Sequence, residues 1–185
     1  HLKGFDGVMG GIYDGDTVYG NDRNSGQALS TANSTYGLVL DNVAVDSTYT
    51  LSVWVYSENV IVANSPIFSV SNSSDVNNWL TVAGADNGAY KIWNGAWKDD
   101  GSRNYPLNSW VNLTLAVDGT TATVYENGQE VFSYTNDASA ITSDLKQMLF
   151  GVNYWDGFPT GVLDDFRIIH EPMPPSQQPA FYAGT

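Results

Sequence analysis

Apolar and polar residues alternate with a period of two over much of this sequence, and this alternation limits the folds available to the chain. It runs through residues 49–56, 110–117, 121–125 and 161–169, which are rich in β-branched and aromatic residues. Because successive side chains of an extended chain point to opposite faces, the pattern predicts strands that each bury one face. One short turn of helix fits residues 139–148, and the sequence predicts no amphipathic helix longer than two turns.

Tight-turn dipeptides separate these stretches. Asp118-Gly119, Asn127-Gly128, Asn87-Gly88 and Asn94-Gly95 are all pairs that favour hairpin turns. Short strands joined by such turns are typical of antiparallel sandwiches. The sequence therefore predicts an all-β fold, a β-sandwich of two antiparallel sheets.

The same period predicts which side chains face the core. Two rows of aliphatic residues fall on one face of their strands: Leu51, Val53 and Val55, and Leu113, Leu115 and Val117. Trp54 and Trp110 fall on the opposite faces, where large aromatic side chains usually cover the outside of a sheet. The alternative places Trp54 on a concave surface that faces a ligand.

The charge balance excludes several classes of partner. The chain of 185 residues has 7 Lys and Arg against 20 Asp and Glu, a formal net charge of −13. Such a surface repels phosphate backbones and anionic lipids, which argues against nucleic-acid and membrane binding. Since there is no Cys, a disulfide framework, a thiolate zinc site and a cysteine nucleophile are excluded as well.

Length and composition predict one domain over residues 1–185, with a Pro-rich closing segment at 170–179. The apolar residues 180–182 that follow predict that this segment docks on the domain. The sequence starts at His1 without an apolar leader, which fits either a removed signal or a monomeric module cut from a larger protein. Few Lys and many Asn, Ser, Thr and Gly favour an exported, secreted or cell-surface, bacterial protein.

Four pieces in order carry a family resemblance: residues 50–55, 107–119, 122–129, and 150–153 together with 161–169. They resemble the laminin-G-like, concanavalin A-like jelly-roll domains of bacterial carbohydrate-active enzymes and adhesins, over most of residues 26–185. This resemblance implies two stacked antiparallel sheets and a role with glycans. The related glucanases carry a Glu-x-Asp-x-x-Glu cluster on one strand.

That catalytic cluster does not occur in this sequence. Asp164 and Asp165 are adjacent, so on a regular strand they point to opposite faces and do not act on one sugar together. His1 and His170 have no Ser-His-Asp context. We therefore expect a non-catalytic domain, with an unrecognised hydrolase or lyase as the less favoured alternative.

Sugar binding needs flat aromatic faces beside fixed polar groups. Residues 78–79 with 87–105 form one loop-like segment dense in Trp, Tyr, Asn and Gly, and residues 153–159 form another. Trp97 and Trp155 lie among turn residues and are predicted to be exposed for stacking, whereas alternation leaves Trp93 either in the core or at the ligand. The candidate ligand-binding residues are Trp79, Trp93, Trp97, Arg103, Asn153, Tyr154, Trp155 and Asp156.

A calcium ion is implied by the resemblance, because similar jelly rolls often hold a structural calcium between the N-terminal segment and the last strand. The positions that it implies are Asp6 with Asp164 or Asp165. A salt bridge to Arg167 is the alternative for an Asp of the last strand.

The sequence thus predicts a carbohydrate-binding module for a neutral polysaccharide or glycan, attached to a secreted enzyme. An adhesin or protein-interaction module of the same fold is the alternative. The resemblance implies a site either on loops at one edge of the sandwich or on its concave face.

Overall fold

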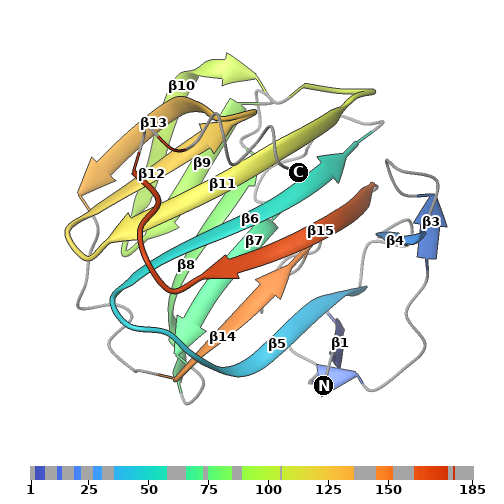
Figure 1. Ribbon diagram of the computed structural model, residues 1–185, viewed down its shortest axis with the longest axis horizontal. Coiled ribbons are helices and arrows are strands. Elements are labelled where there is room, and N and C mark those ends of the chain that lie inside the picture. The colour runs from blue at the N-terminus through green and yellow to red at the C-terminus, as the bar shows by residue number, and fades with distance from the viewer. Residues whose placement is uncertain are drawn as a thin grey trace.

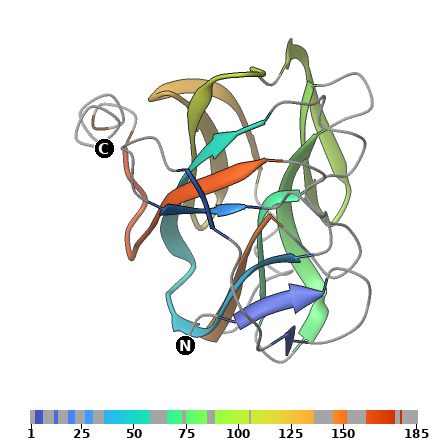
Figure 2. The same cartoon turned by 90° about the vertical axis from the view of Figure 1, so that its right-hand side faces the viewer.

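The computed structural model describes residues 3–6, 12–13, 19–21, 27–30, 36–57, 66–72, 75–84, 89–104, 106–135, 145–151, 161–174 and 177. Within these ranges the chain forms fifteen strands in two antiparallel sheets and no α-helix. Figure 1 shows one sheet in front of the other, and Figure 2 shows the two layers from the side. The predicted class, an all-β antiparallel sandwich, is confirmed. No helix in the described part of the chain is long and apolar enough to span a membrane.

The two sheets are named A and B. In spatial order, the described strands of sheet A are β10 (Trp97–Asn104), β9 (Ala89–Asn94), β8 (Asp75–Gly84), β7 (Pro66–Asn72), β14 (Leu145–Phe150), β5 (Tyr36–Ala44), β1 (Lys3–Asp6) and β2 (Ile12–Tyr13). Those of sheet B are β13 (Gln129–Thr135), β12 (Thr121–Glu126), β11 (Trp110–Asp118), β6 (Thr48–Tyr56), β15 (Val162–Ile169), β4 (Gln27–Ser30) and β3 (Tyr19–Asn21). The late strands β14 and β15 therefore lie inside the sheets, each between strands from much earlier in the chain.

The core lies between the sheets, and the predicted rows supply its sheet B side. Leu113 pairs with Val53, and Leu115 pairs with Leu51, so β6 and β11 present their aliphatic side chains at the same level. All six residues of the two predicted rows are buried. The facing side chains of sheet A are also fully buried: Phe68, Val70, Leu80, Val82, Tyr90, Ile92, Met148 and Phe150.

The outward face of sheet B carries the two tryptophans that the alternation placed there. Trp54 is 7% exposed and lies outside the core cluster, so it covers the sheet and leaves little ring surface for a ligand. Trp110 is half-buried and packs against Tyr56, with ring centroids 5.7 Å apart. Both tryptophans are fold residues, as expected from the burial of large aromatic side chains.

Three of the four predicted turns connect neighbouring strands. Asn127 and Gly128 both have positive φ, 51° and 77°, as a tight β12–β13 hairpin of this type requires. At the β11–β12 turn, the Asp118 carboxylate accepts from the backbone N–H groups of Thr120 and Thr121 at 3.1 and 2.6 Å. Asn94-Gly95 joins β9 to β10, and residues 87–88 lie outside the described part.

The expected helical turn at residues 139–148 is wrong for residues 145–148, which belong to β14. The sequence signal was misleading because Lys146 and Gln147 are polar yet buried. The Lys146 ammonium donates to the carbonyl oxygen of Val45 at 2.6 Å, so a distant part of the chain satisfies this charge. Residues 139–144 are not described.

The closing segment docks on the outward face of sheet B (Figure 1). The Thr50 hydroxyl donates to the Glu171 carbonyl at 2.9 Å and accepts from the Met173 N–H at 2.8 Å. Thr50 is fully buried on the first part of β6. Residues 180–182, whose apolar character predicted this docking, lie outside the described part.

Candidate functional site

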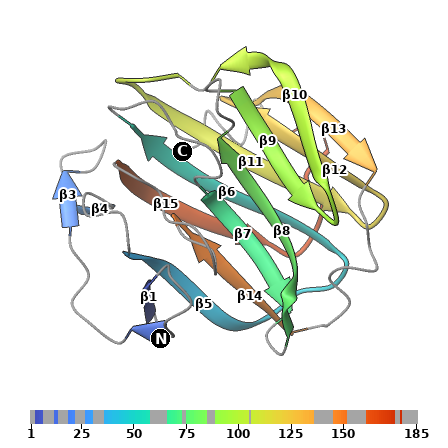
Figure 3. The ribbon, with the colours of Figure 1, turned by 180° about the vertical axis from the view of Figure 1, so that it is seen from behind.

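Three tryptophans from three neighbouring strands meet on the outward face of sheet A. Trp79 lies on β8, Trp93 on β9 and Trp97 on β10, at the end of the sheet seen from behind in Figure 3. Trp97 pairs directly with Trp93 across the β9–β10 hairpin. On β9, Tyr90 and Ile92 are buried in the core, so the alternating Lys91 and Trp93 point to the opposite face. We call Trp79, Trp93 and Trp97 the tryptophan cluster.

The rings of the tryptophan cluster contact one another. Trp79 and Trp93 are stacked, with centroids 5.6 Å apart and an interplanar angle of 18°. Trp93 and Trp97 meet edge to face, at 5.3 Å and 72°. Both separations lie within the range of favourable aromatic pairs, so each ring holds its neighbour in place.

A cation lies over the third ring. The Lys91 ammonium is 4.0 Å from the centroid of the Trp97 ring, within cation–π range. Lys91 precedes Trp93 by two residues on the same face of β9, so strand geometry positions both against Trp97. The contact adds to the restraint on the Trp97 ring.

Solvent reaches the cluster mainly at Trp97, which is 39% exposed, while Trp79 and Trp93 are half-buried. Exposing so large an apolar ring forfeits burial energy, about 25 cal/mol for each Å² left in water. A solvent-exposed ring that is also held rigid is suited to stacking against the C–H face of a ligand.

The structure brings together three of the predicted ligand residues: Trp79, Trp93 and Trp97. It differs from the sequence prediction in one respect, because most of residues 89–104 is not a loop but the β9–β10 pair. Turn-forming residues next to Trp97 made this strand look like a loop in the sequence. The pairing of Trp97 with Trp93 depends on the register of the hairpin, which local sequence does not show. The alternative that placed Trp93 in the core is wrong, because Trp93 is half-buried on the outward face.

The remaining predicted ligand residues are not placed. Arg103 belongs to β10, but its side chain lies outside the described part of the structure. Residues 153–156, which contain Asn153, Tyr154, Trp155 and Asp156, also lie outside it. Their roles stay predictions.

Polar side chains that the sequence analysis missed continue this face beside the cluster. Thr81 pairs with Trp93 on one side and Ser69 on the other, and the hydroxyls of Thr81 and Ser69 are hydrogen-bonded to each other. Ser71 pairs with Trp79, and its buried hydroxyl has no hydrogen-bond partner among the residues described. The alternation of Ser69 and Ser71 with Phe68 and Val70 was the available signal.

A laminin-G family described as the concanavalin A-like lectin/glucanases superfamily matches residues 24–177. The chain belongs to this superfamily. Its predicted resemblance is therefore confirmed. A search of curated proteins finds no match to the chain.

Several solved structures resemble this concanavalin A-like domain. Domain 4 of AbnA, a GH43 extracellular arabinanase from Geobacillus stearothermophilus solved in complex with arabinotriose, is 25% identical over 98% of this chain and 87% of that one, with a TM-score of 0.78. Trypanosoma rangeli sialidase with 2,3-difluorosialic acid is 15% identical, over 84% of this chain and 27% of that one, with a TM-score of 0.67. A structure of botulinum neurotoxin type C is 11% identical over 100% of this chain and 46% of that one, with a TM-score of 0.66. The last two show a shared fold alone. The family and the arabinanase domain support a lectin-like, glycan-related domain.

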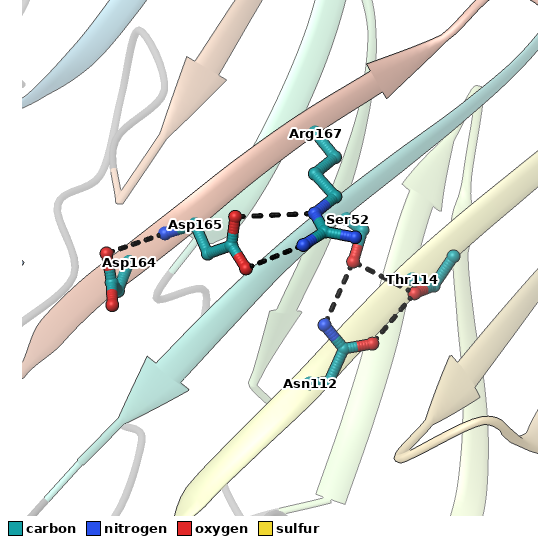
Figure 4. A network of polar contacts seen from close by, with 6 residues as sticks. All are labelled: Ser52, Asn112, Thr114, Asp164, Asp165 and Arg167. Atoms are coloured by element: carbon teal, nitrogen blue, oxygen red, sulfur yellow. Dashed lines mark hydrogen bonds and ion pairs between the residues drawn. The ribbon is translucent and has the colours of Figure 1, made fainter. Parts of the chain in front are cut away.

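A second polar network lies on the outward face of sheet B in this concanavalin A-like domain (Figure 4). The Asn112 amide donates to the Ser52 hydroxyl at 2.9 Å, and the Thr114 hydroxyl, with its one proton, lies within hydrogen-bond distance of the Ser52 hydroxyl at 3.2 Å and of the Asn112 amide oxygen at 3.1 Å. All three side chains are buried. Because their polar atoms satisfy one another, the network ties β6 to β11.

The aspartates of the last strand lie beside that network in Figure 4. Both carboxylate oxygens of Asp165 accept from the Arg167 guanidinium, at 3.0 and 3.3 Å, and the pair is partly exposed. Asp165 has φ 52° at a bulge between Asp164 and Arg167, and its N–H donates to the Asp164 carboxylate at 2.8 Å. The alternative that paired an aspartate with Arg167 is therefore seen for Asp165.

The described residues provide a poor fit to calcium by themselves. Calcium takes six to eight oxygen ligands, whereas the described part holds no group of three or more Asp, Glu, His or Cys side chains placed for a metal. Asp165 is already bound to Arg167. Asp6 lies on β1, but its side chain is not described. Calcium at Asp6 with Asp164 or Asp165 stays a prediction.

Proposed function

We propose that this domain is a non-catalytic carbohydrate-binding module that holds a neutral, arabinose-containing polysaccharide on the tryptophan cluster. The observation that carries the proposal is the exposed Trp97 ring, which Trp93 and Lys91 contact on the outward face of sheet A. An aromatic ring in this position stacks on the apolar face of a sugar, and nearby amides and hydroxyls orient it.

The class of sugar is supported by the most informative of the similar structures. Domain 4 of the arabinanase, which is 25% identical over 98% of this chain, was solved in complex with arabinotriose. Charge supports a neutral ligand, because 20 acidic residues against 7 basic ones disfavour a polyanion. We therefore propose arabinan, or an arabinose-substituted plant polysaccharide, as the ligand.

Three carboxylates of the described part have structural contacts, which supports a binding role. Glu126 is buried and accepts from the Tyr90 hydroxyl at 2.7 Å, inside the core. Asp165 is paired with Arg167, and Asp118 holds a turn. Each of these groups has a structural task, and glycosidic cleavage needs two carboxylates that flank one bond.

We propose further that the domain is a monomeric module of an exported bacterial protein. The composition favours export, and the similar arabinanase is extracellular. A module of this kind keeps an attached enzyme close to its polysaccharide, which raises the local substrate concentration.

Titration of linear arabinan and arabinotriose into the wild type and Trp97→Ala by isothermal calorimetry tests the proposal. A central tryptophan at a binding site usually contributes at least 2 kcal/mol, so we expect Kd to rise by about 30-fold or more. Leu107→Ala is the matched control, since Leu107 is an exposed apolar residue outside the cluster, at 36% exposure. Equal arabinan affinity in Trp97→Ala and the wild type, with both folded, would refute the proposed site.

A further inference from the structure

The tryptophan cluster does not present a flat surface. The planes of Trp93 and Trp97 cross at 72°, whereas rings that lie side by side under a flat sugar lattice share one plane. Trp79 and Trp93 are nearly parallel, but at 5.6 Å they stack on each other. A sugar ring does not fit between aromatic rings that are already in contact.

The ring faces are also partly occupied. Trp79 and Trp93 each use one face on the other, and both rings are half-buried. The Lys91 ammonium lies over the Trp97 ring at 4.0 Å. The ring surface left for a ligand is therefore concentrated at the exposed part of Trp97, which suits one principal stacked sugar.

Lys91 contributes by orienting Trp97. Trp97 stands at the start of β10, next to a turn, where a tryptophan side chain would otherwise sample several rotamers. The Trp93 edge contact and the Lys91 cation both favour the observed position before the ligand arrives. Restricting a binding side chain in advance lowers the entropic cost of binding.

On the basis of the proposed function, we infer that the cluster selects single, soluble, non-planar glycan chains or chain ends and rejects the flat faces of crystalline polysaccharides, with Lys91 as a positioning residue. Flexible arabinofuranose chains fit such an angled surface. Crystalline cellulose and chitin, whose exposed faces are flat, do not.

Depletion assays with microcrystalline cellulose and with chitin, beside calorimetry with arabinotriose and linear arabinan, test the selectivity. We expect the wild type to bind both arabinose ligands and to stay in the supernatant with either crystalline solid. Because Trp97 supplies the principal stacked contact, the Kd per site for arabinotriose and for linear arabinan should agree within about threefold.

Binding to cellulose or chitin with an affinity equal to that for arabinan would overturn the inference while the proposed function stands. Failure to bind arabinose ligands, with Trp97→Ala also without effect on any glycan, would instead reject the proposed function. The two failures are therefore distinguishable.

A second set of variants tests Lys91. Lys91→Met keeps the aliphatic stem but removes the charge, and we expect it to weaken arabinotriose binding by about two- to fivefold. Lys91→Arg restores a cation over the ring and should recover wild-type affinity, while all three proteins melt at similar temperatures. Loss of affinity in Lys91→Arg as large as in Lys91→Met, or no loss in Lys91→Met, would show that the cation does not position Trp97.

Discussion

Thr50→Val removes one hydroxyl at the point where the closing segment meets sheet B. That hydroxyl donates to the Glu171 carbonyl at 2.9 Å and accepts from the Met173 N–H at 2.8 Å. Valine has nearly the same shape as threonine, so the substitution removes the two hydrogen bonds and little packing. Because Thr50 is fully buried, a water molecule cannot take the place of the lost hydroxyl at this position.

The expected magnitude follows from the two bonds. Each contributes about 1 kcal/mol net, so Thr50→Val should lower the free energy of unfolding by about 2 kcal/mol. Glu171 is exposed and Met173 is half-buried, so water can bind the backbone groups that lose their partner. No additional cost for unsatisfied buried groups is therefore expected. For a domain of this size, about 2 kcal/mol corresponds to a fall in Tm of about 4 to 8 °C.

Urea unfolding followed by tryptophan fluorescence measures this change, and amide hydrogen exchange at Met173 locates it. Thr50→Ser is the matched control because it keeps the hydroxyl and loses one buried methyl group, about 1 kcal/mol. The Met173 amide should stay protected in Thr50→Ser and exchange faster in Thr50→Val. If Met173 exchanges at the wild-type rate in Thr50→Val, the hydroxyl does not hold the closing segment and the reasoning is wrong.

Three further predictions concern stability. The Tyr134 hydroxyl oxygen is buried without a hydrogen-bond partner in the described part of the chain, so Tyr134→Phe should raise the free energy of unfolding by about 1 kcal/mol in urea melts, and a loss would contradict this. Burial raises the pKa of Tyr134 and of Tyr49 above the ordinary value, and the charge of Tyr49 raises the pKa of Tyr134 further. Because unfolded tyrosines ionise near pH 10, the free energy of unfolding should be constant below about pH 10 and fall above it. This fall should be less steep in Tyr134→Phe. Calcium held in the native state at about a hundred times its Kd adds about 2.7 kcal/mol, so excess chelator should lower the Tm, and an unchanged melt would count against the calcium prediction.

Local patterning accounts for most of sheet B. Strands β6, β11 and β12 were predictable because their apolar residues recur with a period of two, although the structure buries both faces of β6 and β11. Strand β15 follows the same pattern except at the bulge between Asp164 and Arg167. The same alternation placed Trp54 outside the core, where it is buried against the sheet. Period and turn chemistry are local properties, so the sequence alone is enough to determine them.

Both sheets contain buried polar positions, and in sheet A these positions obscured the pattern of two strands. Ser69 and Ser71 on β7 and Lys146 and Gln147 on β14 are polar residues that the tertiary structure removes from water. Burying such groups is tolerated when partners are available, as when Val45 accepts from Lys146. Those partners lie far away in the chain, and no local pattern indicates them.

The candidate site shows the same division. Sequence alone determined that the chain is an acidic, cysteine-free, antiparallel sandwich with tryptophans at positions that alternation does not explain. Tertiary structure decided that Trp79, Trp93 and Trp97 meet on one face, because this depends on the pairing of β8 with β9 and of β9 with β10. It also decided the angles between the rings, which side-chain packing across strands sets and which local spacing does not contain.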